Sequence, residues 1–213
     1  MKIQLAPAQA VAISKAIAPA ISKEKHKYHL QQIQISPQGD SKNGYATSVR
    51  FAATDGFRLH TVELVNSYDP HEWSESITVS GAKLVKALAD AAKKDKTGTV
   101  NIECVGAGAP AVMVTNTHND TGMNQYVVCV DMSSEHMPQI DGLLTGSLNQ
   151  DMELPATYDA RYLADMVKSA GAVSEAVKIT GISTRRCGRV EATGDSYGDT
   201  GLSFVGLLMP QRA

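Results

Sequence analysis

The segment that decides the fold is residues 51–60, "FAATDGFRLH". Asp-Gly between two apolar runs is a strong local signal for a turn that joins two antiparallel strands. A bulky aromatic residue and an arginine, Phe57 and Arg58, follow this turn at once. The segment therefore predicts a hairpin, and it raises the question of whether the turn holds these side chains up for a partner.

The chain around the hairpin predicts one strand, one helix and three further strands. Residues 6–22 repeat apolar side chains near helical spacing, and Pro19 should end or kink that helix because proline cannot supply a helical hydrogen bond. The other expected elements are strands at 3–5, 29–36, 48–54 and 57–64, with a turn at 37–44.

The same order of elements occurs twice more. The second copy predicts a strand at 76–79, a helix at 80–94 with Ser80 as its N-cap, and strands at 99–105, 111–116 and 124–132. The third predicts a strand at 152–155, a helix at 157–171 that stops at Gly171, and strands at 176–182, 188–193 and 201–210.

This repetition predicts an α+β fold of three βαβββ modules, because a repeated unit buries its helix stripe only by packing on a neighbour. The expected modules are residues 1–66, 73–131 and 151–213. The first two form one complete domain, 1–131, and the third stands alone. Residues 132–150 show no strong periodicity and are interpreted as a connector.

Length and composition are those of an ordinary globular protein. The 213 residues are 43% hydrophobic and 20% charged, with a formal net charge of −2. No apolar run approaches the roughly 20 residues that a membrane span needs, and no secretion signal is evident. The three scattered cysteines are therefore expected to be reduced thiols in a cytoplasmic protein.

No group of residues predicts catalysis or metal binding. Cysteine and histidine residues lack the spacing of metal ligands, and isolated acids such as Asp120, Asp141 and Asp159 do not make an acid–base pair. The expectation is a protein with no metal, no cofactor and no enzymatic activity. An enzyme whose site is assembled from distant residues is the remote alternative.

Cations recur on the helices, away from the apolar stripes. For one helix alone, an ordinary solvated face explains them better, since cations also favour helix C-termini. Because all three equivalent helices carry them, alignment of the helices would give one basic surface suited to phosphates without base reading. The candidate DNA-facing residues are Lys15, Lys23, Lys83, Lys86, Lys93, Lys94, Arg161 and Lys168.

Three segments resemble the bacterial DNA polymerase III beta subunit, the replicative sliding clamp. Residues 53–59, "ATDGFRL", are similar to the family's "ATDGHRL". The chain end, "FVGLLMPQRA", is similar to "YVVMPMRL", and His136-Met137-Pro138 resembles the family's "FPDYRRVLP" connector. These matches lie in the family's order, on a chain with the family's module pattern.

The resemblance implies a ring in which helices line the central hole and strands form a continuous antiparallel outer sheet. Family rings hold twelve modules, made of two six-module chains or three four-module chains. Residues 1–131 would correspond to the complete middle domain and the third module to half of the last domain. Three modules per chain then imply a homotetrameric ring, with the third module pairing with the first or third module of a neighbour.

The resemblance also implies a hydrophobic pocket that grips short linear peptides of polymerase, clamp-loader and repair proteins. Relative to the family pattern, Phe57 replaces histidine, Gly142 replaces arginine, and the tail residues Gln211 and Ala213 are less apolar. The matching positions are Leu30, Thr54, Gly56, Phe57, Arg58, Leu59, Pro138, Leu143, Leu207, Met209, Pro210, Gln211 and Arg212.

The function expected from the resemblance is that of a processivity factor, which encircles duplex DNA without sequence preference and tethers a polymerase through the pocket. The short chain favours a phage or plasmid origin. The alternative is a clamp-derived interaction protein that keeps the pocket and binds clamp-binding peptides without encircling DNA.

Overall fold

A computed structural model describes residues 2–40, 45–65, 75–105, 111–134, 137–148, 158–180, 187–193 and 201–210. The first module has the predicted order of elements. Two short 3-10 turns, η1 and η2, separate its helix from its second strand, and Pro19 lies in η1, where α1 ends. The elements are β1 (Lys2–Leu5), α1 (Pro7–Ile17), η1 (Ala18–Ala20), η2 (Tyr28–Leu30), β2 (Gln32–Asp40), β3 (Tyr45–Thr54) and β4 (Arg58–Val65).

The second module repeats this order, and the third repeats it from its helix onward. The strand predicted at 152–155 lies outside the described residues. The second module has β5 (Ile77–Ser80), α2 (Gly81–Lys94), β6 (Thr99–Val105), β7 (Ala111–Thr117) and β8 (Asn124–Asp131). The third has α4 (Ala160–Ala170), β9 (Lys178–Thr180), β10 (Gly188–Thr193) and β11 (Leu202–Leu208).

Modules 1 and 2 are joined by an exchange of their first strands. β1 pairs antiparallel with β6 of module 2, and β5 pairs antiparallel with β2 of module 1. The described strands form a four-stranded sheet, β1-β6-β7-β8, and a seven-stranded sheet, β5-β2-β3-β4-β11-β10-β9. The predicted antiparallel α+β fold is confirmed, and an isolated bridge between Val79 of β5 and Met132, just after β8, links the two sheets.

Module 3 joins module 1 of its own chain. Strand β11 pairs antiparallel with β4, from Leu202 opposite Leu64 to Leu208 opposite Arg58. The expectation that a neighbouring chain supplies this partner is therefore wrong for the β11 side. The physical reason is that β4 ends the first module with an open edge, which a strand of the same chain covers at little cost in loop entropy.

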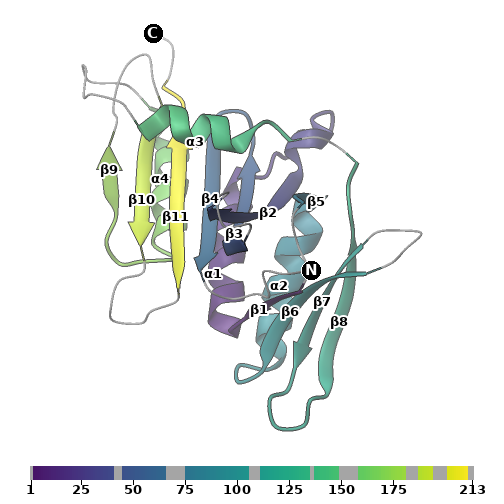
Figure 1. The fold of residues 1–213 in the computed structure, drawn as a ribbon. Coiled ribbons are helices and arrows are strands. Elements are labelled where there is room, and N and C mark those ends of the chain that lie inside the picture. Colours follow the sequence, from purple (N-terminus) through teal and green to yellow (C-terminus); the bar gives the residue numbers. More distant parts are fainter. Residues whose placement is uncertain are drawn as a thin grey trace.

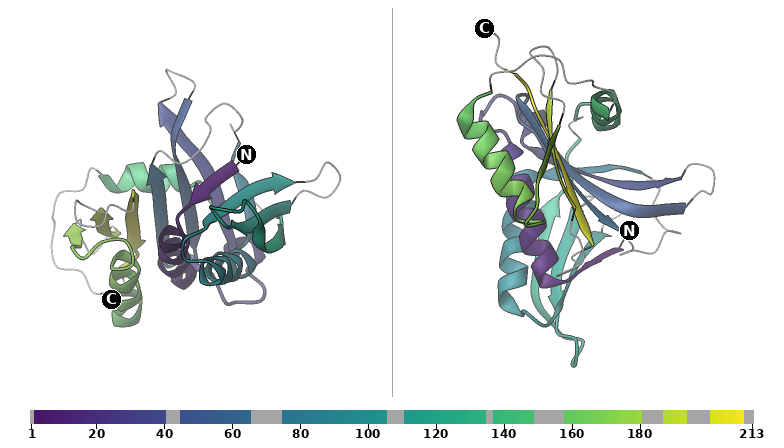
Figure 2. Two further views of the ribbon diagram at one scale, coloured as in Figure 1. Left: turned by 90° about the horizontal axis from the view of Figure 1, so that it is seen from below. Right: turned by 90° about the vertical axis from the view of Figure 1, so that its left-hand side faces the viewer.

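The helices of the three modules form one layer behind the sheets. Figures 1 and 2 show α1, α2 and α4 on one face, and α3 (Ile140–Leu148) on the opposite face, across β4 and β11. The core lies between the helix layer and the strands, where Ile13, Leu88 and Met166 are buried from the helix side and Phe51 and Phe204 from the strands.

Two local details differ from the sequence prediction. The connector contains α3, which its two glycines and weak periodicity did not indicate. The turn predicted at 37–44 is shorter, because β2 continues through Pro37 to Asp40 with a bulge between Gln38 and Gly39. Pro37 is tolerated there because β5 pairs with β2 only as far as Ile35, so Pro37 lies beyond the second neighbour.

Within the part of the chain that the structure describes, no helix has the length and apolar character of a membrane span.

Candidate functional site

The hairpin turn between β3 and β4 is held by its own side chains. The Thr54 hydroxyl donates to the Arg58 carbonyl at 2.7 Å and accepts from the Gly56 amide at 3.1 Å. Asp55 Oδ1 accepts from the amides of Phe57 and Arg58, at 3.0 and 3.1 Å. Gly56 has φ of 93°, a conformation that glycine adopts without steric cost. Hydrogen bonds from Thr54 and Asp55 therefore hold the turn in one conformation.

Arg58 ties this turn to the third module. Its Nε donates to Asp55 Oδ2 at 3.0 Å, and an Nη donates to Asp165 Oδ2 on α4 at 2.9 Å. The guanidinium also lies 4.6 Å from the centre of the Tyr162 ring. The side chain is only 9% exposed, so these charge-assisted bonds are stronger than surface ion pairs.

Phe57 stays half-exposed beside this cluster. Its ring stacks on Tyr162 with the centroids 5.9 Å apart, and Lys27 Nζ lies 5.5 Å from the Phe57 centroid. The Phe57 carbonyl accepts a hydrogen bond from the Met209 amide at 3.0 Å. The turn of module 1 and the end of β11 are thus bonded to each other directly.

A cavity of about 170 Å³ opens between the turn and the chain end, and most of its lining is apolar. Module 1, the connector and module 3 all contribute to it, so the cavity exists only because β11 docks on β4. It is lined by Leu30, Thr54, Gly56, Phe57, Arg58, Leu59, Pro138, Leu143, Cys187, Leu207 and Met209.

Ten of the thirteen pocket residues expected from the resemblance line this cavity. Pro210 follows Met209 but is not in the lining, and Gln211 and Arg212 lie outside the described residues. Of the connector match, His136 also lies outside them. The structure therefore brings together residues that are more than 170 positions apart in the sequence, such as Leu30 and Met209.

Sequence reasoning missed Cys187. Its thiol lies 3.2 Å from the Met209 sulfur, and burial raises the pKa of this thiol above its ordinary value. Cys187 therefore adds a neutral, polarizable group to the lining. A signal was present, since Cys187 directly precedes the strand predicted at 188–193, whose neighbour is the last strand.

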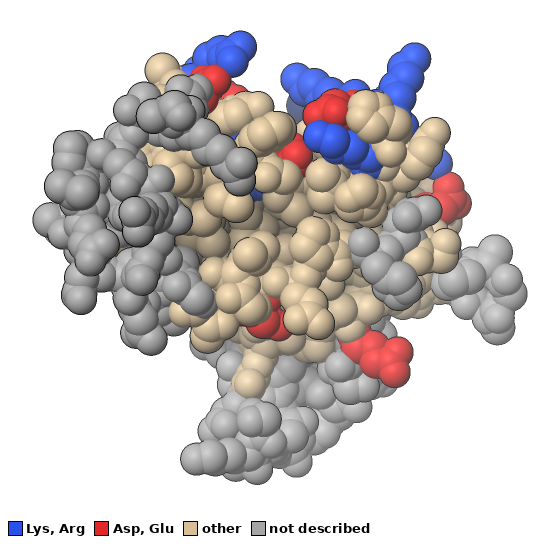
Figure 3. All heavy atoms as spheres, turned by 90° about the horizontal axis from the view of Figure 1, so that it is seen from above, with Lys and Arg blue, Asp and Glu red and all other residues tan. Residues whose placement is uncertain are grey.

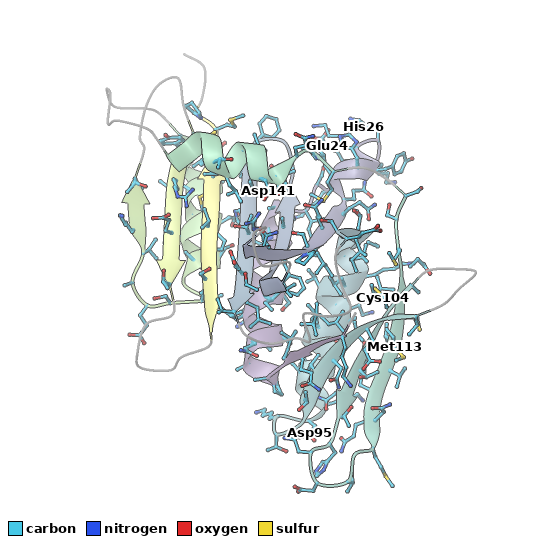
Figure 4. All side chains as sticks on the ribbon, viewed as in Figure 1. Glu24, His26, Asp95, Cys104, Met113 and Asp141 are labelled. Carbon is cyan, nitrogen blue, oxygen red and sulfur yellow. The ribbon has the colours of Figure 1, made fainter. Side chains whose placement is uncertain are left out.

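The connector forms one wall of the cavity. Ile140 and Leu144 of α3 pack on a small cluster with Ala52, Leu59 and Leu207. Asp141, which Figure 4 labels at the sheet, forms an ion pair with Arg50 of β3. With α3 fixed in this way, Pro138 and the 44%-exposed Leu143 reach the cavity.

The helix layer carries the second candidate surface. Every charged residue of α1, α2 and α4 that is exposed as a whole is Lys or Arg. The two acids of these helices, Asp90 and Asp165, are partly buried and pair with Lys93 and Arg58. Figure 3, seen from above, shows Lys and Arg side chains along one side of the molecule, with a few Asp and Glu beside them. These helices hold seven cations and two acids, while the whole chain has a net charge of −2.

The eight predicted DNA-facing residues differ in how they are held. Lys83 pairs with Asp131 at 2.8 Å, Lys93 with Asp90 at 3.8 Å and Arg161 with Asp159 at 2.7 Å. No ion pair of the described residues involves the others, which are all exposed: Lys15, Lys23, Lys86, Lys94 and Lys168. The described residues also contain no His, Cys, Asp and Glu group that could hold a metal ion.

The whole chain is similar to solved bacterial sliding clamps. The DnaN sliding clamp (DNA polymerase III subunit beta) of Bartonella birtlesii, bound to griselimycin, superposes with a TM-score of 0.71 at 13% identity, with 100% of this chain and 66% of that chain covered. The beta subunit of Thermotoga maritima has a TM-score of 0.70 at 11% identity, with 100% of this chain and 66% of that chain covered. The beta subunit of Pseudomonas aeruginosa has a TM-score of 0.66 at 14% identity, with 100% of this chain and 67% of that chain covered.

No family model and no curated protein matches the sequence. The likeness therefore rests on the arrangement of the elements, and the chain spans about two thirds of the length of the clamps that it matches. The fold of this chain is that of the DNA polymerase III beta subunit, the bacterial sliding clamp, in a shortened form.

Proposed function

We propose that this chain is the subunit of a sliding clamp, a ring that encircles duplex DNA without sequence preference and tethers a polymerase or other partner. The observation that carries the proposal is the helix layer. Three equivalent helices lie on one face and carry seven cations against two acids, in a chain that is negative overall. Lys and Arg side chains attract the phosphates of any sequence, so a protein held by them alone can slide along DNA.

The cavity at the turn supports the tethering part of the proposal. An apolar groove that exposes Phe57, Leu143 and Met209 fits the hydrophobic anchors of a short peptide. A flexible methionine at such a site adapts to different side chains. Polymerase, clamp-loader and repair proteins are the partners proposed, each through a short linear segment.

The ring is proposed to contain four chains. The described sheets end at β1 and β8 and at β5 and β9, and strand edges that have no partner recruit other strands. The chain supplies three modules, so twelve require four copies. Four chains of 22.7 kDa give a complex of about 91 kDa, which light scattering measures directly. A stable monomer at micromolar concentration would remove the ring from the account.

The pocket is tested separately with Met209→Ala. Met209 is 49% exposed and its side chain lines the cavity, while its backbone holds the turn. The variant should weaken binding of a fluorescent clamp-binding peptide roughly tenfold, the effect of losing one buried anchor, and leave the native mass unchanged. Pro210→Ala, outside the lining, is the matched control. Equal peptide affinity in both variants would remove the pocket from the account.

The alternative, a clamp-derived interaction protein, shares the pocket but not the ring. The observation in its favour is that the chain covers only two thirds of the clamps that it matches. It predicts normal peptide binding together with no topological hold on DNA. The two functions are therefore separated by DNA retention.

A further inference from the structure

One flank of α4 is uncovered although the equivalent flanks of α1 and α2 are buried. The helices align from their N-caps Ala6, Ser80 and Asp159. The fourth residue after the cap is buried in α1 and α2 but only partly buried, as Leu163, in α4. The eighth is 4% and 1% exposed in α1 and α2, and 40% exposed in α4. These positions are Ala10, Leu84 and Leu163, and Ser14, Leu88 and Val167.

The sheet-facing positions show that α4 otherwise sits as the other helices do. The seventh and eleventh residues after the cap are at most 2% exposed in all three helices. They are Ile13, Ala87 and Met166, and Ile17, Ala91 and Ala170. What differs is therefore the flank alone. In modules 1 and 2, α1 and α2 pack on each other, and we infer that this flank is their contact; α4 itself packs on α1.

The strand beside this flank is uncovered as well. The second strands of modules 1 and 2, β2 and β6, each pair on one side with a first strand from the other module. The equivalent strand of module 3 is β9. It ends the seven-stranded sheet, and Ile179 on it is 48% exposed. Among its described residues, module 3 thus lacks, on both layers, the neighbour that modules 1 and 2 provide for each other.

The joints already present follow one rule, in which like edges meet. Modules 1 and 2 meet through their second-strand sides in a reciprocal exchange, β1 with β6 and β5 with β2. Modules 1 and 3 meet through their last strands, β4 and β11. Apart from the first strands β1 and β5, the strands that end the described sheets are β9, a second strand, on module 3 and β8, a last strand, on module 2. A second strand and a last strand are unlike edges. β9 of one chain and β8 of another therefore cannot pair by either kind of joint that this chain shows.

We propose that module 3 packs against module 3 of a second copy of this chain, in the two-fold manner of modules 1 and 2. Leu163, Val167 and Ile179 of one chain would then pack against the same three residues of the partner chain. By the same rule, β8 pairs with β8 of another copy. This rests on the proposed ring and fixes its symmetry: two kinds of isologous joint alternate around four chains.

The consequence concerns the pockets. The two-fold axis must place helices on helices and strands on strands. It therefore runs perpendicular to the sheet, along a radius of the ring, and a half-turn about it exchanges the two rims. Neighbouring chains therefore face opposite ways, and the cavity at Phe57 and Met209 opens on both rims, twice on each. A ring of chains joined head to tail would place all four cavities on one rim.

Native masses of two variants distinguish these assemblies. Val167→Glu places two like charges in the module 3 joint, and Val127→Asp with Cys129→Asp does so at β8, where both residues are exposed. Because each variant breaks only one kind of joint, the proposal expects half of the wild-type mass for each and monomers when they are combined. Ala164→Glu is the matched control, because its equivalents Val11 and Val85 remain partly exposed in the packed pair.

The outcomes separate the proposal from the proposed function. A tetrameric wild type with monomeric Val167→Glu means one kind of head-to-tail joint, which overturns the two-fold arrangement and leaves the ring. A tetrameric Val167→Glu overturns the α4 joint. A monomeric wild type overturns the ring itself. Circular dichroism spectra that match the wild type show that a smaller mass reports assembly rather than unfolding.

Discussion

At the scale of single residues, both the pocket wall and the joint between modules 1 and 3 depend on Arg58. The chain places one buried guanidinium between the turn aspartate, Asp55, and Asp165 of another module, with Tyr162 beneath it. Removing either acid leaves a buried charge that is less well paired, which costs more than the net contribution of the bond. The pocket wall and the joint between modules 1 and 3 therefore share one support.

We expect Asp165→Asn to lower the free energy of unfolding by about 1–2 kcal/mol, since Asp165 is itself partly exposed. Peptide affinity should fall with it, because the turn loses its tie to α4. Denaturant unfolding and fluorescence anisotropy measure the two effects. Arg189→Lys, on β10 and outside the cavity, is the control that should keep peptide affinity. An Asp165→Asn protein with unchanged affinity would show that the tie does not shape the pocket.

His60 makes the same joint sensitive to pH. It is fully buried on β4, its Nδ1–H donates to the Ala16 carbonyl at 2.8 Å, and its ring meets Phe204 of β11 edge-on. Burial lowers the pKa of His60 from 6.5 to about 4. The folded protein therefore binds fewer protons than the unfolded chain between these values, and stability rises with pH there.

The expected result is a stability that is constant above pH 6.5 and falls by on the order of 2–3 kcal/mol as the pH drops through about 4. His60→Asn removes the titration and keeps a donor for the Ala16 carbonyl. Urea unfolding of both proteins between pH 4 and 8 makes the comparison. A variant that loses stability with the same slope as the wild type would show that other groups cause the loss.

At the scale of elements, helices and strands with a regular apolar pattern could be predicted from the sequence, whereas the helix in the connector could not. Helix α2 follows from its apolar stripe of Leu84, Leu88 and Ala91, which is the face that it buries. Helix α3 has two glycines and weak local preference, and it forms because Ile140 and Leu144 find a partner surface on β3, β4 and β11. A surface assembled from distant strands leaves no trace in local spacing.

The helix layer predicts a measurable dependence on salt. Replacing Lys15, Lys86 and Lys168 by alanine, one on each helix, should weaken duplex binding and lower the slope of log K against log salt by about one for each lost phosphate contact. Lys178→Ala, an exposed lysine on β9, is the control. Equal slopes for the triple variant and the control would mean that the helices do not face DNA.

At the scale of the whole molecule, three modules were evident from repetition, but their joints were not. The split into two sheets and the docking of β11 on β4 depend on which open edges meet, and that choice pairs residues up to 150 positions apart, Arg58 with Leu208. The residues of the cavity could be predicted only through the resemblance of three segments to the sliding-clamp family, because its walls meet only after this docking. Cys187 was missed for the same reason.

A ring of four chains closed around DNA should be retained on circular duplex DNA. Chains are diluted until they dissociate, mixed with a nicked circular duplex, and concentrated so that rings close around it. Gel filtration at high salt then suppresses ionic binding. We predict that the protein stays with the circle and is released when one restriction cut linearises it. Equal retention on circular and linear DNA, or retention on neither, would contradict the account.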